Sequence, residues 1–377
     1  MPNLPLFAQP TMHRWGAWSA ALALALCAQT AALGSSLSFS LNNWQLVCDN
    51  TRTCRAAGFS VDGAANPVSV LLTRKAGPRE AVHAQVMIGN YGQDGAAVPL
   101  PSILKLSMRV NGRAAGQTII HTNRTMTADL SAAQVNTLLA ALPRPSTIEW
   151  RAGAERWALS DKGSSAVLLK MDAFQGRIGT MGALIKKGTG SDDGVLPPLT
   201  VPEVLTSAPA KPQPGDAHLV ERLGGALRNA LVASVKKSNY CPMLTEPEED
   251  VVVELALNRL SDQKFLISVP CWSGAYNFGT GYWVVNERPP FNPVLVTDSG
   301  SGYRDGSIFA SQKGRGLGDC WSTDSWEWNG KQFIHTESSS TGLCRLIAAG
   351  GSWDLPTIVT QADRRSTSKR AEHRYRK

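Results

Sequence analysis

The sequence lacks the short motifs that mark the common enzyme and metal-binding classes. It contains no Cys-x-x-Cys pair, and no histidine lies at zinc-ligand spacing from a cysteine, which argues against a zinc site. No Gly-x-Ser-x-Gly sequence supports a serine hydrolase. Gly314, Gly316 and Gly318 resemble a phosphate loop, but no predicted helix follows them. We therefore predict no catalytic residues, no metal site and no cofactor.

Long apolar runs are also missing. The most apolar stretch, residues 15–28, is shorter than the roughly 20 residues that span a bilayer. His13 and Arg14 precede it and small residues follow, which is the pattern of a secretory signal peptide. We expect residues 1–34 to be this signal peptide and to be cleaved, and the mature protein to be soluble and either periplasmic or secreted.

Acidic residues are fewer than basic ones, and the formal net charge is +8. The C-terminal segment 363–377 alone contributes +5, and Arg14 in the signal peptide contributes another +1. The rest of the chain is therefore close to neutral, so we predict no nucleic-acid partner. We expect residues 361–377 to form a disordered basic tail, and a weak electrostatic contact of this tail with a membrane is one interpretation of its charge.

Cysteines are few, but their number is informative. One of the seven lies in the expected signal peptide, and six remain: Cys48, Cys54, Cys241, Cys271, Cys320 and Cys344. An even number in an exported chain predicts disulfides, although six cysteines allow 15 pairings. If the two early cysteines lie in their own domain, they must pair with each other. The order along the chain then favours Cys241–Cys271 and Cys320–Cys344, while the two crossed pairings of these four remain open.

Proline divides the chain. Residues 189–217 contain six prolines among glycine, serine, aspartate and alanine, which predicts an extended linker. The linker separates an N-terminal domain, residues 35–188, from a C-terminal domain, residues 218–360. Each is long enough to bury its own core.

Both domains are predicted to be rich in β-strands. In the first, Asn111-Gly112 between two alternating segments predicts a hairpin. Ser131 with Gln134 forms a capping box before a helix, and a second helix is expected at residues 164–174. In the second domain, a helix at residues 216–237 precedes short strands, and Asn329-Gly330 marks another hairpin. We predict a mainly β fold, with an N-terminal β-sandwich carrying one or two helices and a C-terminal antiparallel β domain preceded by a helix.

Several longer motifs resemble one bacterial exported family, domain of unknown function 1176. They are WQLVCDNTRTCR at 44–55, MDAFQGR at 171–177, CWSGAYN at 271–277, GRGLGDC at 314–320, WEWNG at 326–330 and Cys344-Arg345. The resemblance implies a location in the cell envelope and no known activity, so it supplies no catalytic residues. The opening motif is also similar, more loosely, to the invasion-associated locus B proteins.

Aromatic residues are scarce overall, at 7%, but the second domain is rich in tryptophan and tyrosine. Tryptophan offers a large apolar face with one polar group, which suits sugar or peptide contacts, although core packing should account for most of these residues. The candidate binding residues are Trp272, Tyr276, Ser299, Tyr303, Trp326 and Trp328. Trp326 and Trp328 share one strand face, which is either core or an exposed aromatic platform.

Three functions remain open. The leading hypothesis is a non-enzymatic envelope protein that binds a glycan, a peptide or another envelope protein, and exposed aromatics without a deep pocket favour it. The second is an inhibitor of a host lysozyme, because residues 299–303 resemble the Ser-Gly-x-x-Tyr loop of such inhibitors, and a protruding loop would favour it. The third is an envelope hydrolase using Asp298, Asp305 and Asp319, which requires a cleft with two carboxylates roughly 5–9 Å apart.

Overall fold

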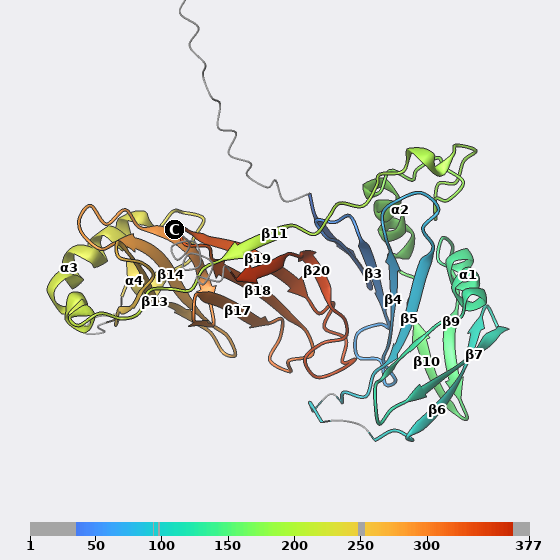
Figure 1. Cartoon of the computed structure of the whole chain (residues 1–377). Coiled ribbons are helices and arrows are strands. Elements are labelled where there is room, and N and C mark those ends of the chain that lie inside the picture. Colours follow the sequence, from blue (N-terminus) through green and yellow to red (C-terminus); the bar gives the residue numbers. More distant parts are fainter. Residues whose placement is uncertain (1–34, 93, 97–98, 248–252, 365–377) are drawn as a thin grey trace, which may run out of the picture. The chain divides into compact units, whose positions relative to one another are not determined.

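The computed structural model describes residues 35–92, 94–96, 99–247 and 253–364 (Figure 1). The expected signal peptide and residues 365–377 of the expected tail lie outside these described residues. Within them, no helix combines the length and apolar character needed to cross a membrane.

The first part of the chain folds into two antiparallel sheets and two helices (Figure 1). Its strands are β1 (Leu37–Leu41), β2 (Trp44–Cys48), β3 (Cys54–Phe59), β4 (Val68–Arg74), β5 (Val82–Ile88), β6 (Ile103–Val110), β7 (Arg113–His121), β8 (Thr127–Asp129), β9 (Ile148–Ala152) and β10 (Glu155–Leu159). Its helices are α1 (Ala132–Ala141) and α2 (Ser164–Phe174). The six-stranded sheet has the order β1-β2-β3-β4-β5-β8, and the four-stranded sheet has the order β10-β9-β6-β7.

Local sequence signals account for several of these elements. Asn111 and Gly112 have φ values of 50° and 79°, which a type I′ turn requires at both central positions, and they join β6 to β7 as predicted. At the start of α1, the hydroxyl of Ser131 accepts a hydrogen bond from the backbone N–H of Gln134. The side chain of Gln134 in turn accepts one from the backbone N–H of Ser131. This reciprocal pair is the predicted capping box.

The two sheets enclose one core. Trp44 and Leu46 from the first sheet, and Leu106 and Trp150 from the second, belong to the same buried cluster, together with side chains of α1 and α2. The sheets therefore pack face to face, which confirms the predicted sandwich with two helices. Cys48 and Cys54 lie directly opposite each other on β2 and β3 and form a disulfide.

The second part contains the remaining elements. They are the short 3-10 helix η1 (Asp192–Gly194), β11 (Glu203–Thr206), α3 (Asp216–Ser234), α4 (Pro242–Thr245), β12 (Ala256–Arg259), β13 (Lys264–Ser273), β14 (Phe278–Asn286), β15 (Val294–Gly300), β16 (Gly302–Arg304), β17 (Ser307–Lys313), β18 (Trp321–Trp328), β19 (Phe333–Ser340), β20 (Leu355–Ile358) and β21 (Gln361–Arg364). A four-stranded antiparallel sheet has the order β12-β13-β14-β15, and a five-stranded one has the order β16-β17-β18-β19-β20. Helix α3 precedes both sheets, as predicted.

The β12–β15 sheet buries both of its faces. Phe265, Ile267 and Trp283 lie in one cluster with Leu227 and Leu231 of α3. The alternate positions of β13 and β14, such as Leu266 and Tyr282, lie in another cluster with Ile308 and Trp328 of the five-stranded sheet. Because neighbouring strand residues point to opposite faces, the sheet is sandwiched between α3 and the second sheet.

Two segments outside the predicted domains also form structure. Strand β11 lies inside the expected linker, and β21 consists of the first four residues of the expected tail. They pair with each other as parallel strands, with Glu203 opposite Gln361. The division of the chain at residues 189–217 into two domains stays a prediction.

The C-terminal strands also share a core with the N-terminal sheet. Phe59 and Leu71 lie in one buried cluster with Ile347, Trp353 and Leu355. The indole N–H of Trp353 donates to the hydroxyl of Ser69 at 2.7 Å. We call the cluster and this hydrogen bond the junction core. It connects residues that are almost 300 positions apart in the sequence.

Candidate functional site

The second disulfide brings two aromatic residues to one place. Cys241 precedes α4 and Cys271 lies near the end of β13, and the structure joins them. Tyr240 and Trp272, their immediate neighbours in sequence, line a cavity of about 350 Å³. The other lining residues are Pro242, Met243, Glu246, Pro247, Val253 and Ser273. We call this set the aromatic pocket.

Asp298 on β15 holds the ring of Trp272 and the backbone of Tyr240 at the pocket. Its backbone carbonyl accepts a hydrogen bond from the indole N–H of Trp272 at 3.1 Å. Its carboxylate accepts one from the backbone N–H of Tyr240 at 2.9 Å, and another from the hydroxyl of Ser299 at 2.8 Å. The Trp272 ring also covers Gly279, where it leaves no room for a Cβ. Trp272 is therefore held in one orientation before any ligand arrives.

The pocket offers a mainly apolar surface with few polar groups. The ring of Tyr240 is 65% exposed. Ser273 pairs across the strands with Phe278, which is 55% exposed. Residues paired in this way share one face of a sheet, so Phe278 extends the aromatic surface beside Ser273. Among the lining residues that the structure describes, Glu246 carries the one charged group.

The structure separates the other predicted binding residues from this pocket. Tyr276 is 47% exposed, but a Cβ at Gly316 would touch its ring, so it lies beside the loop of residues 314–318. Tyr303 packs edge-on against Phe333, with ring centroids 6.4 Å apart, and burial raises the pKa of its hydroxyl. Ser299 has the supporting role described above.

Trp326 and Trp328 do not form an exposed platform. Trp328 is only 1% exposed and belongs to the core between the two C-terminal sheets. Trp326 packs against the same core and stacks on His335, with centroids 4.7 Å apart. Of the two interpretations, core or exposed aromatic platform, the strand face that carries both tryptophans is therefore core.

The acids proposed for a hydrolase lie apart. Asp298 supports the aromatic pocket, and Asp305 lines a separate cavity beside Tyr303. Asp319 is buried beside the third disulfide. His335 pairs with Asp324 at 2.9 Å and not with Asp319. Residues 299–303 lie largely in β15 and β16 and include the half-buried Tyr303. Among the described residues, these three acids therefore belong to three different features, and residues 299–303 belong mainly to strands.

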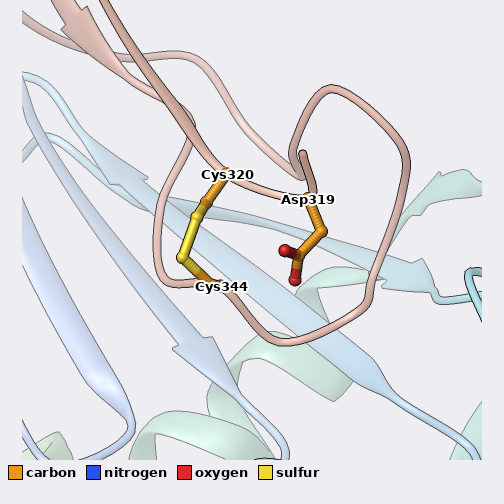
Figure 2. Close-up of side chains that lie close together, drawn as sticks. All are labelled: Asp319, Cys320 and Cys344. Atoms are coloured by element: carbon orange, nitrogen blue, oxygen red, sulfur yellow. A yellow bond between two sulfur atoms is a disulfide. The ribbon is translucent and has the colours of Figure 1, made fainter. Parts of the chain in front are cut away.

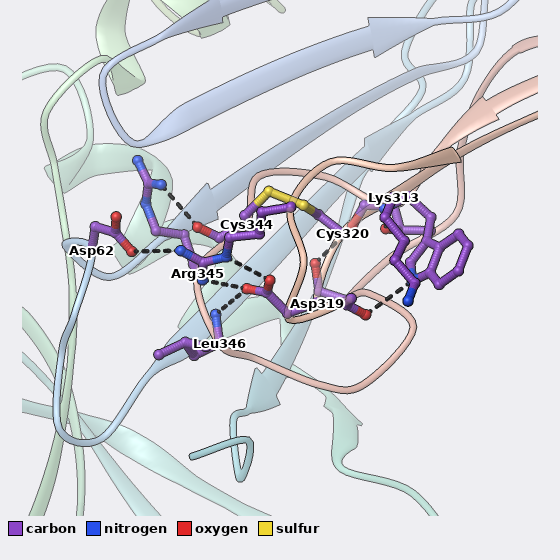
Figure 3. Close-up of a disulfide and its surroundings, with 12 residues drawn as sticks. Asp62, Lys313, Asp319, Cys320, Cys344, Arg345 and Leu346 are labelled. Atoms are coloured by element: carbon purple, nitrogen blue, oxygen red, sulfur yellow. Dashed lines mark hydrogen bonds and ion pairs between the residues drawn. A yellow bond between two sulfur atoms is a disulfide. The ribbon is translucent and has the colours of Figure 1, made fainter. Parts of the chain in front are cut away.

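Asp319, Cys320 and Cys344 form a compact group in which one ligand-type atom of each residue lies within 4.8 Å of the others (Figure 2). The two sulfurs are joined in a disulfide. The carboxylate accepts hydrogen bonds from Arg315 at 2.7 and 2.6 Å and from the backbone N–H of Leu346 at 2.8 Å (Figure 3). The two sulfurs and the carboxylate therefore already have partners and are not free metal ligands. Their bonds connect the loop that contains Asp319 and Cys320 to the segment that contains Cys344 and Leu346.

The same group contacts the N-terminal sheet region. Arg315 also lies 3.7 Å from Asp62, and Arg345 donates to the backbone carbonyl of Cys344 (Figure 3). Arg345 donates a second hydrogen bond to the side chain of Asn43. The backbone carbonyl of Leu317 accepts a hydrogen bond from the hydroxyl of Tyr91 at 2.6 Å. The glycine-rich loop is thus a turn anchored by the Cys320–Cys344 disulfide, and it contacts residues of the N-terminal part through Asp62 and Tyr91.

The Asp319 ion pair predicts a pH-dependent stability. Burial alone would raise the pKa of Asp319, but the hydrogen bonds from Arg315 and Leu346 outweigh it and hold the pKa below its usual value. A carboxylate with a lowered folded-state pKa stabilises the fold above its unfolded-state pKa, and this contribution is lost as the pH falls through the folded-state pKa. We expect Asp319→Asn to lower the free energy of unfolding by about 2–3 kcal/mol at pH 7.

Urea unfolding of both proteins between pH 7 and pH 3 measures this effect. The difference between wild type and Asp319→Asn should shrink once the pH falls below about 4, near the unfolded-state pKa of an aspartate. Asp305→Asn serves as the control, and it should show no such convergence because no ion pair is found for it among the described residues. A difference that stays constant down to pH 3 would contradict the assignment.

Comparison with known proteins agrees with the motif resemblance. Residues 38–360 match the family described as "Protein of unknown function (DUF1176)". The chain is 25% identical over 348 residues to the "Uncharacterized protein YpfG" of Escherichia coli (strain K12), covering 84% of this chain and 91% of that protein. No solved structure matches the chain. These matches do not extend to the invasion-associated locus B proteins, and that resemblance stays a prediction.

Proposed function

The chain belongs to the DUF1176 family of proteins of unknown function, and from this premise we propose that it is an exported, non-enzymatic binding protein of the cell envelope. Its ligand is an envelope protein that inserts an apolar side chain into the aromatic pocket. One observation carries this proposal: a disulfide and Asp298 hold the Trp272 ring and the backbone of Tyr240 beside a cavity before any ligand binds. Preorganised aromatic side chains of this kind dominate the energetics of protein interfaces.

The disulfides support the location. Cys48–Cys54, Cys241–Cys271 and Cys320–Cys344 indicate an oxidising, non-cytoplasmic compartment. The expected signal peptide at residues 1–34 would deliver the chain there, and the periplasm is the compartment that we propose.

The chemistry of the lining favours a peptide over a glycan. A sugar ring carries hydroxyls on most of its carbons, and each hydroxyl that is buried requires a hydrogen-bond partner. Among the described lining residues, the side chains that can pair with a hydroxyl are those of Glu246, Ser273 and Tyr240, and Pro242, Met243, Pro247 and Val253 lie beside them. An apolar side chain next to a basic residue, which would pair with Glu246, fits this surface better.

Affinity capture from an envelope extract tests the proposal. The full-length protein, Trp272→Ala and Tyr240→Ala are immobilised, and the captured proteins are identified by mass spectrometry, purified and titrated. We expect each variant to weaken binding of the same captured protein by at least about tenfold. Tyr240→Ala tests binding without disturbing the fold. Tyr240 is largely exposed, so removing its ring should leave the structure intact.

Phe309→Ala is the matched control. Phe309 is an aromatic residue of the same domain, 47% exposed, on β17 and outside the pocket, and its removal should leave binding unchanged. Purified peptidoglycan fragments form a second arm. If their retention depended on Trp272 and no protein showed such dependence, the ligand would be a glycan and the proposal would be wrong.

A further inference from the structure

A second cavity, in the N-terminal sandwich, has a different chemistry. It measures about 760 Å³ and lies between the end of α1 and residues 184–187. Arg144, Lys186 and Lys187 line it together with the apolar side chains of Leu139, Leu184 and Ile185. We call it the basic cavity. It lies on a different pair of segments from the aromatic pocket, so nothing below depends on the proposed function.

A buried side chain of helix α2 holds the backbone next to Lys186 and Lys187 through hydrogen bonds. The side chain of Asp172 on α2 is fully buried. Its carboxylate accepts hydrogen bonds from the backbone N–H groups of Leu184 at 2.7 Å and Ile185 at 2.9 Å. The backbone carbonyl of Lys186 accepts another from Gly179 at 2.9 Å. The segment is therefore held in place before any ligand binds, although the lysine side chains themselves are exposed.

The charge of the cavity is unbalanced. Within the described part of the chain, its lining contains three cations and no aspartate or glutamate. Among the residues that the structure describes, no salt bridge is found for Arg144, Lys186 or Lys187. Three uncompensated positive charges around one hollow attract an anion, and an arginine with two lysines suits a phosphate group.

The volume of the basic cavity and its apolar side chains restrict the kinds of ligand that it can bind. A volume of about 760 Å³ is in the range of sites for drug-sized ligands and far exceeds what a single phosphate ion fills. Leu139, Leu184 and Ile185 are partly buried and face the same hollow as the cations. The ligand should therefore carry a phosphate next to an apolar segment.

We propose that the basic cavity binds an anionic phospholipid, with the headgroup phosphate at Arg144, Lys186 and Lys187 and the first acyl carbons against the apolar wall. The basic C-terminal segment, residues 365–377, lies outside the described residues, and its expected membrane contact is a separate electrostatic effect. The basic cavity would bind one lipid headgroup specifically, whereas the C-terminal segment would attract any anionic surface through its charge.

Calorimetric titration of the full-length protein with monomeric dihexanoyl phosphatidylglycerol tests the proposal. Arg144→Gln, Lys186→Gln and Lys187→Gln are combined in one variant. Because each of the three basic side chains would make a charge-assisted contact with the headgroup phosphate, we expect this variant to bind on the order of 100-fold more weakly. Dihexanoyl phosphatidylcholine, which has no net charge, should bind the wild type much more weakly than phosphatidylglycerol.

The matched control removes the same charge elsewhere on the same domain. Lys105, Arg113 and Arg124 are exposed and lie outside the cavity, and replacing all three by glutamine should leave the affinity within about twofold. Equal losses in both triple variants would show that binding follows overall charge, and this would overturn the proposal. Inorganic phosphate at the same concentration should not bind detectably. If it bound as tightly as the lipid, the apolar wall would have no part and the lipid assignment would fail.

A variant that lacks residues 365–377 distinguishes lipid binding in the basic cavity from lipid binding by the tail. It should keep the full affinity for monomeric phosphatidylglycerol. Loss of that affinity on deletion of the tail would place the site in the tail and overturn the proposal. Circular dichroism and the thermal midpoint of each variant establish that the fold is intact.

Discussion

Replacing Arg177 by methionine is expected to lower the free energy of unfolding by about 2–4 kcal/mol. Arg177 is fully buried. It donates to the side chain of Gln175 at 2.9 Å and to the backbone carbonyls of Lys75 at 3.2 Å and Gly77 at 2.7 Å. The substitution leaves these three acceptors buried without this donor, and an unsatisfied buried group costs about 1–3 kcal/mol.

The effect should extend to the charges nearby. Burial and the adjacent Arg177 lower the pKa of Arg74 to about 10, and Arg74 lies 3.8 Å from the buried carboxylate of Asp172. Gln175 donates to the backbone carbonyls of Arg52 and Arg74, both at 3.0 Å. Removing Arg177 relieves its repulsion of Arg74, but it also takes away the donor to the side-chain oxygen of Gln175. It should therefore loosen the contacts that join Gln175 to the turn before β3 and to the end of β4.

Urea unfolding followed by far-ultraviolet circular dichroism measures the Arg177 effect. Arg113→Met is the control, because Arg113 is an exposed arginine on β7 and should change the free energy of unfolding by less than about 0.5 kcal/mol. If Arg177→Met lowered the free energy of unfolding by less than about 1 kcal/mol, the hydrogen bonds of Arg177 would contribute little to the stability of the sandwich.

Replacing Trp353 by alanine is expected to cost a similar amount, about 3–5 kcal/mol. The ring of Trp353 is 8% exposed and packs in the junction core with Phe59 and Ile347. Its removal leaves a large cavity and also deprives Ser69 of the indole hydrogen bond. Because the junction core joins the N-terminal sheet to the C-terminal strands, the variant should also unfold less cooperatively, in two transitions.

Trp353→Phe separates packing from the hydrogen bond. It keeps an aromatic ring in the cluster and should cost less than half of the alanine variant. Phe309→Ala, an exposed aromatic on β17, should have little effect. Differential scanning calorimetry and urea unfolding both report the number of transitions. A single unchanged transition for Trp353→Ala would show that the junction core contributes little to stability.

Local signals explain what could be predicted of the fold. The turn at Asn111-Gly112 needs two residues with positive φ, and the capping box needs Ser131 and Gln134 three positions apart. Both requirements are satisfied within a few residues, so the sequence reveals them. Asn329-Gly330 also marks a hairpin as predicted. There the side chain of Asn329 accepts hydrogen bonds from the backbone N–H groups of Lys331 and Gln332 in a longer turn.

The aromatic pocket could be predicted only in part. Trp272 is a candidate from sequence because it follows a cysteine in a tryptophan-rich domain. Tyr240 was missed, although it directly precedes Cys241, and the favoured Cys241–Cys271 disulfide was the signal that could have placed it beside Trp272. The contribution of Asp298 was not visible, because it is 58 residues from Tyr240 and acts partly through its backbone.

The sequence by itself determined the family and the mainly β character, because these depend on motifs and on alternation within short segments. It favoured the three disulfide pairs but left the crossed pairings of the last four cysteines open, and the structure decided between them. Only the tertiary structure decided which face of Trp326 and Trp328 is core, that Arg177 is buried, and that β11 pairs with β21. Each of these depends on partners far away in the sequence: the backbone acceptors of Arg177 lie about 100 residues away, and β21 is more than 150 residues beyond β11. A side chain's own neighbours set its local conformation, but burial and charge compensation are set by whatever the folded chain places against it.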